Sequence, residues 1–205
     1  MNPPMHSGDA RRTRPDGPPR RRRRAWLGAL GLLLVALLGP ASGVGAESAA
    51  ALEYKVKAGY LFNFAKFVEW PASALPANNS PIVIGVLMDD PAAAIIEQQL
   101  QGKVANDHPL SVKLLPNLTG LMACHMLFIS RAQTERTEDL LAKAQIAPVL
   151  LVGEVDQFAH RGGMINFIRK DESFRLEVNL EAAEKAGLKV SSKLASIATL
   201  VKTRK

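Results

Sequence analysis

Cysteine is nearly absent from this chain of 205 residues, in which Cys124 is the only one. A single cysteine cannot form an intramolecular disulfide, so the fold has to be stabilised by packing. We expect a free thiol buried in the core at this position, with a disulfide-linked dimer as the alternative interpretation.

Apolar runs long enough to span a bilayer, which takes roughly 20 residues, are also missing. The run at 26–38 follows the arginines of 20–24 and precedes small residues that end at Ala46. This arrangement is typical of an export signal peptide, so we expect residues 1–46 to be cleaved and the product to be secreted or periplasmic. The arginine pair at 23–24 keeps twin-arginine export open beside ordinary export, and an uncleaved anchor helix is a further alternative.

Excess positive charge is missing from the part of the chain that follows the leader. The whole chain has 26 basic and 19 acidic residues, but eight of the basic ones and only two of the acidic ones precede Glu47. Residues 47–205 therefore carry 18 basic and 17 acidic groups, a net charge of +1. A pI near 9.8 would usually suggest a nucleic-acid partner, but here we expect none.

Motifs that would indicate an enzyme are missing too. No glycine-rich phosphate loop follows the apolar run at 82–88, and there is no G-x-S-x-G nucleophile motif. His108, His125 and His160 are too widely separated to pair on a helix, while His125 and its neighbour Cys124 would point to opposite faces of a strand. We therefore expect no catalytic residues, no metal and no cofactor, and a hydrolase or metalloenzyme is the least favoured interpretation.

Three apolar runs without alternation are the strongest structural signal, at residues 82–88, 126–129 and 149–152. Continuous apolarity predicts strands that are covered on both faces, as in a parallel sheet between helices. Helical patterns lie between the runs, at 91–100, with Asp90 as its N-cap, and at 134–145. The order predicts a single compact α/β domain at 47–205, with a largely parallel central sheet and helices on both faces.

Further elements are predicted around this centre. Apolar alternation indicates a strand at 110–115 and a pair of strands at 164–168 and 174–179. Helices are predicted at 54–69, 180–186 and 192–201. In the last of these, Leu194, Ile197, Ala198 and Val201 repeat with the helical period.

Aromatic residues are few, at 5% of the chain, but they cluster in the first helix of the predicted domain and just beyond it. The apolar face of this helix is wider than one core contact requires, which leaves two interpretations. The helix lies deep in the core, or it presents a surface for self-association or partner binding. That surface would consist of Tyr60, Phe62, Phe67 and Trp70.

Four sequence blocks follow one another across residues 55–201. They are GYLFNFAKFVEWP at 59–71, CHMLFIS at 124–130, GGMINF at 162–167, and RLEVNL at 175–180 continuing to SSKL at 191–194. Each block is weak alone, but together they resemble the YfiR family of periplasmic regulators. The resemblance implies a compact α/β domain with a largely parallel sheet and no enzymatic activity.

The resemblance also implies partners. Such proteins bind the periplasmic sensor part of a membrane-anchored diguanylate cyclase and repress it, which lowers cyclic-di-GMP and biofilm formation. An outer-membrane lipoprotein can sequester the repressor, and family members commonly form homodimers. Relatives often carry cysteines where this chain has Ala159 and Asn166, so control through intramolecular disulfides is not expected here.

Two candidate sites follow from these considerations. Period-two alternation in the strand at 174–179 places Arg175, Glu177 and Asn179 on one face, either as a solvated face or as a partner-binding surface, and the resemblance favours Glu177. The alternative function is a small-molecule-binding sensor domain for another signalling partner. Its pocket would lie at the carboxyl ends of the strands, near Asp89, Ser130 and Gly153.

Overall fold

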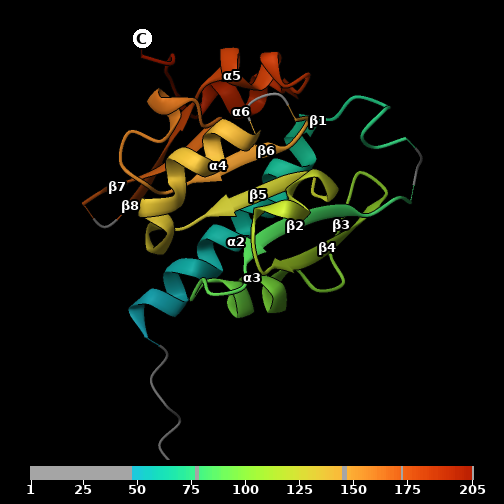
Figure 1. Cartoon of the computed structure of the whole chain (residues 1–205), viewed down its shortest axis with the longest axis horizontal. Helices are drawn as coiled ribbons and strands as arrows, with labels where there is room; N and C mark the ends of the chain where they lie inside the picture. Colours follow the sequence, from blue (N-terminus) through green and yellow to red (C-terminus); the bar gives the residue numbers. More distant parts are fainter. Residues whose placement is uncertain (1–47, 77–78, 145–146, 172, 205) are drawn as a thin grey trace, which may run out of the picture. The chain divides into compact units, whose positions relative to one another are not determined.

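The computed structural model describes residues 48–76, 79–144, 147–171 and 173–204, so the predicted signal peptide lies outside the described residues. In the described part, an eight-stranded sheet and a separate two-stranded sheet belong to one compact α/β domain (Figure 1). The order across the large sheet is β10-β8-β7-β6-β5-β2-β4-β3. Its strands are β2 (Ile82–Leu87), β3 (Val104–Ala105), β4 (His108–Leu115), β5 (Met126–Ile129), β6 (Leu150–Gly153), β7 (Ile165–Lys170), β8 (Ser173–Val178) and β10 (Thr199–Leu200).

Most strand pairs of the large sheet are parallel, which confirms the predicted sheet type. The central strands β4, β2, β5, β6 and β7 all run in the same direction. Antiparallel pairs occur toward the two edges, at β7–β8 and β3–β4. The two-stranded sheet joins β1 (Val68–Glu69) to β9 (Lys189–Val190), two elements that the sequence patterns did not predict.

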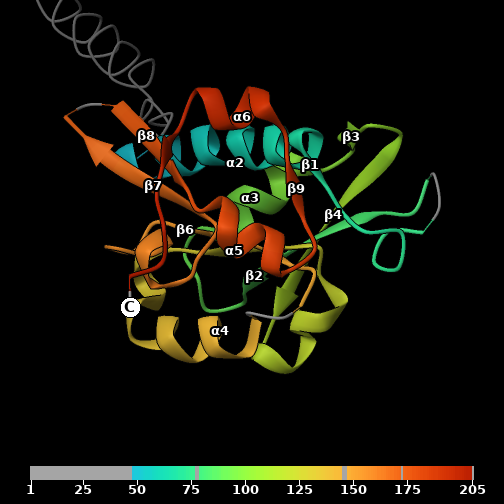
Figure 2. The ribbon, with the colours of Figure 1, turned by 90° about the horizontal axis from the view of Figure 1, so that it is seen from above.

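Helices cover both faces of the sheet, as predicted. Figure 2 shows α2 and α6 on one side and α4 on the other, and α3 packs against α2. The α-helices are α2 (Ala49–Phe67), α3 (Ala93–Leu100), α4 (Thr137–Ala144), α5 (Leu180–Lys185) and α6 (Ser192–Ser196). Short 3-10 helices are η1 (Leu118–Ala123), η2 (Arg131–Arg136) and η3 (Ala159–Arg161). No helix among the described residues has the length and apolarity needed to cross a membrane.

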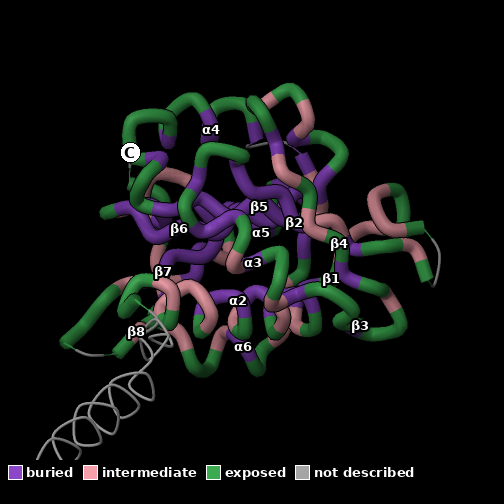
Figure 3. Tube along the Cα trace, turned by 90° about the horizontal axis from the view of Figure 1, so that it is seen from below, coloured by how far each residue is buried: buried purple, intermediate pink, exposed green. Residues whose placement is uncertain are grey.

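The core follows the apolar runs of the sequence. Every residue of β5 and β6 is buried, and β2 is buried except at Val83 (Figure 3). Strand β4 mixes buried and exposed positions, because it lies next to the short edge strand β3 and so near the margin of the sheet. Continuous apolarity therefore identified β2, β5 and β6 correctly.

Several predicted boundaries shift in the structure. Helix α2 begins five residues earlier than predicted, because the Ser48 side chain accepts a hydrogen bond from the Ala51 amide at 3.1 Å and caps it. Asp90 caps the turn that leads into α3 by accepting from the Ala92 amide at 2.8 Å, but regular helix starts only at Ala93. The helix predicted at 134–145 consists of η2 followed by α4.

The last predicted helix is wrong in its second half. Helix α6 ends at Ser196, and Thr199–Leu200 forms the edge strand β10, parallel to β8. The Val201 amide donates to the Val178 carbonyl at 3.0 Å, so backbone pairing with the open edge of β8 replaces helical hydrogen bonding. Ile197, which the helical period grouped with Leu194, is 67% exposed, whereas Leu194 is buried.

Candidate functional site

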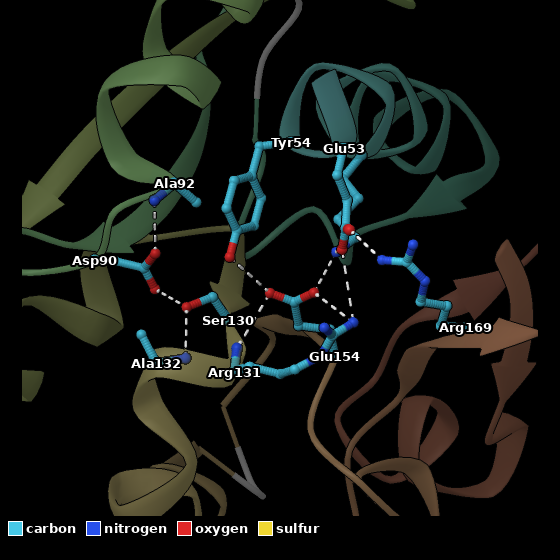
Figure 4. A network of polar contacts seen from close by, with 10 residues as sticks. Glu53, Tyr54, Asp90, Ala92, Ser130, Arg131, Ala132, Glu154 and Arg169 are labelled. Atoms are coloured by element: carbon cyan, nitrogen blue, oxygen red, sulfur yellow. Dashed lines mark hydrogen bonds and ion pairs between the residues drawn. The ribbon is translucent and has the colours of Figure 1, made fainter. Parts of the chain in front are cut away.

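A buried polar network lies at the carboxyl ends of three parallel strands (Figure 4). Asp90 follows β2, Ser130 follows β5 and Glu154 follows β6, which places all three at one edge of the sheet. Helix α2 crosses this edge and contributes Tyr54 and Lys57. The site thus combines residues from four segments that lie far apart in the chain.

Lys57 is the centre of the network. Its side chain is 0% exposed, and its ammonium group donates to Glu154, which is 1% exposed, and to Glu53, one helical turn away. Burial of these charges is tolerated because each ion has an opposite charge and hydrogen-bond partners. The ion pairs therefore tie α2 to the end of β6.

Arginines extend the network toward the surface. Arg169 of β7 donates from Nη1 to Glu53 Oε2 at 2.9 Å. The Arg131 guanidinium lies 3.6 Å from both Glu53 and Glu154, and its backbone amide donates to Glu154 Oε1 at 3.1 Å. Burial opposes ionisation of Glu53, but the hydrogen bond from Lys57 and the surrounding positive charges outweigh it and lower the Glu53 pKa.

The other side of the network consists of Asp90, Ser130 and Tyr54. Ser130 donates to Asp90 Oδ2 at 2.5 Å, and burial raises the pKa of Asp90. The Tyr54 hydroxyl donates to Glu154 Oε1 at 3.2 Å; burial, followed by the negative charge of Glu154, raises the Tyr54 pKa. These shifts stabilise protonated Asp90 and Tyr54.

An open cleft of about 650 Å³ lies beside the network. It exists because β6 ends at Gly153, paired with Asn166, whereas β7 continues to Lys170 and forms a wall without a neighbouring strand on that side. The lining residues are Arg131, Thr134, Glu154, Val155, Asp156, Gln157, Arg161, Phe167, Ile168 and Arg169. Ser130 directly precedes Arg131, and Gly153 directly precedes Glu154, so the predicted pocket region coincides with this cleft. Asp89 is not part of the lining and pairs with Arg136 instead.

The predicted face of β8 is only partly a surface. Arg175 is exposed, whereas the Glu177 side chain is 19% exposed and its Oε1 lies 3.8 Å from His160 Nε2. Asn179 is fully buried, which corrects the expectation that it shares this face. The alternation ends at Val178, because Asn179 caps α5 by accepting from the Ala182 amide at 3.0 Å.

Glu177 has unusual surroundings for a surface residue. Its Oε2 is buried without a hydrogen-bond partner in the described part of the chain. The residue opposite it on β7 is Asn166, whose side-chain amide is buried and equally unpartnered there. A substitution at Glu177 therefore perturbs the packing as well as the surface.

The four aromatic residues predicted as an association surface are all partly buried and pack against the core; they are Tyr60, Phe62, Phe67 and Trp70. Trp70 donates from its indole nitrogen to the His125 carbonyl at 2.9 Å, and the Tyr60 ring meets Phe167 edge-on. The more exposed apolar residues of α2 are Leu52 and Val56, at 52% and 51%. The structure thus gives these aromatics packing roles, and their use as an interface stays a prediction.

Cys124 and His125 have structural roles. Cys124 is a free, buried cysteine whose pKa is raised by burial. His125 accepts from the Val83 amide at 3.0 Å through Nδ1, and Nε2 lies 3.0 Å from the Ala74 carbonyl, so both ring nitrogens are engaged. Among the described residues, no group of three or more His, Cys, Asp or Glu side chains could hold a metal ion.

Sequence reasoning missed Lys57, Glu53, Glu154, Arg131 and Arg169. A signal for Lys57 was available, because it precedes Leu61 and Phe64 by four and seven residues and so lies on the buried stripe of the helix. Glu154 follows a fully apolar strand, a position where polar side chains commonly form sites.

Residues 54–199 match the model of the family described as YfiR/HmsC-like. None of the curated proteins matches the chain.

Proposed function

Because the chain belongs to the YfiR/HmsC-like family, we propose that it is a periplasmic, non-enzymatic regulator of a diguanylate cyclase. It binds the periplasmic sensor part of the membrane-anchored cyclase and represses it, which lowers cyclic-di-GMP and biofilm formation. The family match over residues 54–199 is the observation that carries this proposal, and it agrees with the resemblance found in the sequence motifs.

Repression of this kind is a shift between two states of the sensor. A regulator favours the inactive state only by binding it more tightly than the active one. Moving a sensor from 99:1 active to 1:99 takes a preference of about 10⁴-fold, or roughly 5.5 kcal/mol. An interface of about 800 Å² on each partner is large enough to supply this difference.

The docking surface in this proposal includes the exposed part of β8. Arg175 supplies a guanidinium that forms charge-assisted hydrogen bonds with a carboxylate of the partner, and Glu177 supplies its partly exposed carboxylate. A homodimer and capture by an outer-membrane lipoprotein belong to the same proposal, with Tyr60, Phe62, Phe67 and Trp70 as the candidate association surface. Export through a cleaved signal peptide at 1–46 delivers the protein to the periplasm.

The test is cellular cyclic-di-GMP in the native host with and without this gene. We expect a rise on deletion that the wild-type gene reverses and an Arg175→Glu gene does not. Arg136→Glu is the matched control, since Arg136 is an exposed arginine outside β8. Glu177→Lys is expected to weaken repression too, provided that thermal unfolding shows an intact fold. Unchanged cyclic-di-GMP on deletion would refute the regulator, and full repression by folded Arg175→Glu would refute the surface.

A second function is favoured by the cleft beside Glu154. An open cleft at the carboxyl ends of parallel strands is where α/β domains commonly bind small molecules. In this alternative the protein is a ligand-binding sensor domain for another signalling partner. It would bind its partner only in the presence of ligand, whereas the repressor binds the cyclase sensor without any addition.

A further inference from the structure

The buried carboxylate that lines the cleft already accepts several hydrogen bonds, whereas Gln157 Oε1, also in the lining, is buried without a hydrogen-bond partner in the described part of the chain. Glu154 Oε1 accepts from the Tyr54 hydroxyl and the Arg131 amide, and Glu154 Oε2 accepts from Lys57. Outside the lining, Glu53 likewise accepts from Lys57 and Arg169. The buried carboxylates thus have little capacity left for a cationic ligand.

Two arginines of the lining, Arg131 and Arg169, have hydrogen-bond donors that are not used within the described part of the chain. The Arg131 side chain is 51% exposed, and its two ion contacts at 3.6 Å are longer than hydrogen bonds. Within the described residues, the Arg131 guanidinium therefore donates no hydrogen bond. Arg169 is 57% exposed and uses only Nη1, toward Glu53. Each guanidinium carries five N–H groups, so both retain donors for an incoming anion.

The charge of the lining selects the kind of anion. The lining holds the guanidinium groups of Arg131, Arg161 and Arg169 and the carboxylates of Glu154 and Asp156. Three of these groups have ion-pair partners outside the lining: Arg161 pairs with Glu138, Arg169 with Glu53, and Glu154 with Lys57. With these partners included, four cationic groups balance four carboxylates, so a monoanion fits better than a doubly charged phosphate, which the carboxylates would repel more strongly. The apolar residues Val155, Phe167 and Ile168 complete the lining and suit a ligand with an apolar body.

We propose that this cleft binds a small organic acid, with its carboxylate between Arg131 and Arg169 and its apolar body along Val155 and Ile168. Arginine fits this role because its planar fork binds a carboxylate through two parallel hydrogen bonds. The proposal goes beyond the regulator proposed above and does not depend on it, since none of the lining residues belongs to β8. It also gives the alternative sensor function a ligand class.

Binding is tested on the purified protein by calorimetric titration with phenylacetate, benzoate and hexanoate. Each acid is paired with its uncharged amide, and inorganic phosphate serves as an anion without an apolar body. We expect saturable binding of at least one acid at about 10 mM or below, and none of its amide or of phosphate. No binding by any acid, equal binding by an amide, or equal binding by phosphate would each overturn the proposal.

Variants locate the site. Arg131→Gln and Arg169→Gln are expected to weaken binding of the acid at least about tenfold, which corresponds to about 1.4 kcal/mol. Arg136→Gln is the matched control, because Arg136 ends the same 3-10 helix that Arg131 begins, is 53% exposed and does not line the cleft. Thermal unfolding confirms that each variant folds, and two variants keep the test decisive if one does not. Equal weakening by Arg136→Gln, or none by the folded cleft variants, would place binding elsewhere.

Discussion

Replacing Lys57 with methionine tests whether buried ion pairs fasten α2 to the carboxyl ends of the strands. Methionine keeps the apolar stem and removes the ammonium group, so the packing of the buried stripe is largely preserved. Glu154, whose side chain is 1% exposed, then loses its buried ammonium partner and keeps the Tyr54 hydroxyl, the Arg131 amide and the half-exposed Arg131 guanidinium at 3.6 Å.

The expected loss follows from this burial. Removing one partner of a buried ion pair usually costs about 3–5 kcal/mol, because the remaining charge stays desolvated. A domain of this size changes its melting temperature by about 2–4 °C per kcal/mol, so Lys57→Met should melt roughly 6–20 °C lower. Both values are measurable by circular dichroism during heating and in urea at neutral pH.

Lys185→Met is the matched control. Lys185 also pairs with a glutamate four residues earlier, Glu181, but the two side chains are 65% and 50% exposed. Water screens such a pair, and its loss should cost less than about 1 kcal/mol. The difference between the two lysines then isolates the effect of burial.

The double variant with Glu154→Gln completes the test. Removing both charges leaves an amide that still accepts from Tyr54 and Arg131, so the pair of substitutions should cost less than the sum of the two single ones. If Lys57→Met lost no more stability than Lys185→Met, the network would not fasten α2, and the reasoning would be refuted.

Two further predictions concern pH and close packing. The lowered Glu53 pKa contributes stability above the ordinary glutamate pKa, about 4.3, that is lost as pH falls through the folded value. Glu53→Gln should flatten this acid-side loss in urea unfolding across pH, and parallel profiles would contradict it. Gly163→Ala should lower the free energy of unfolding by about 1–3 kcal/mol, because the new Cβ would overlap the buried Phe158 ring. Gly59→Ala, in open space within α2, should instead raise the free energy of unfolding by about 0.5–1 kcal/mol. Lower stability of both variants in thermal unfolding would refute this contrast.

The sequence predicted the centre of the fold better than its margins. The runs at 126–129 and 149–152 became β5 and β6, because a strand covered on both faces must be apolar throughout. The short strands β1, β9 and β10 were not predicted, because each contains only two residues and forms by pairing with a distant partner.

The sequence predicted where the cleft lies but not which charged residues surround it. Ser130 and Gly153 marked the correct edge of the sheet, since the carboxyl ends of parallel strands meet there. The charged residues that form the site were missed, as Lys57 and Glu154 are separated by 97 positions in the chain. Asn179 was misplaced because strand alternation gives no warning of where a helix cap begins.

The sequence by itself determined the α/β class, the parallel centre and the family, because these depend on local apolar patterns and on motifs that stand in fixed order. Only the tertiary structure decided which charges are buried together, where β6 stops short of β7 to leave a cleft, and that Asn179 lies in the interior. Those features arise from contacts between segments far apart in the chain, and a local pattern carries no information about the partner it will meet.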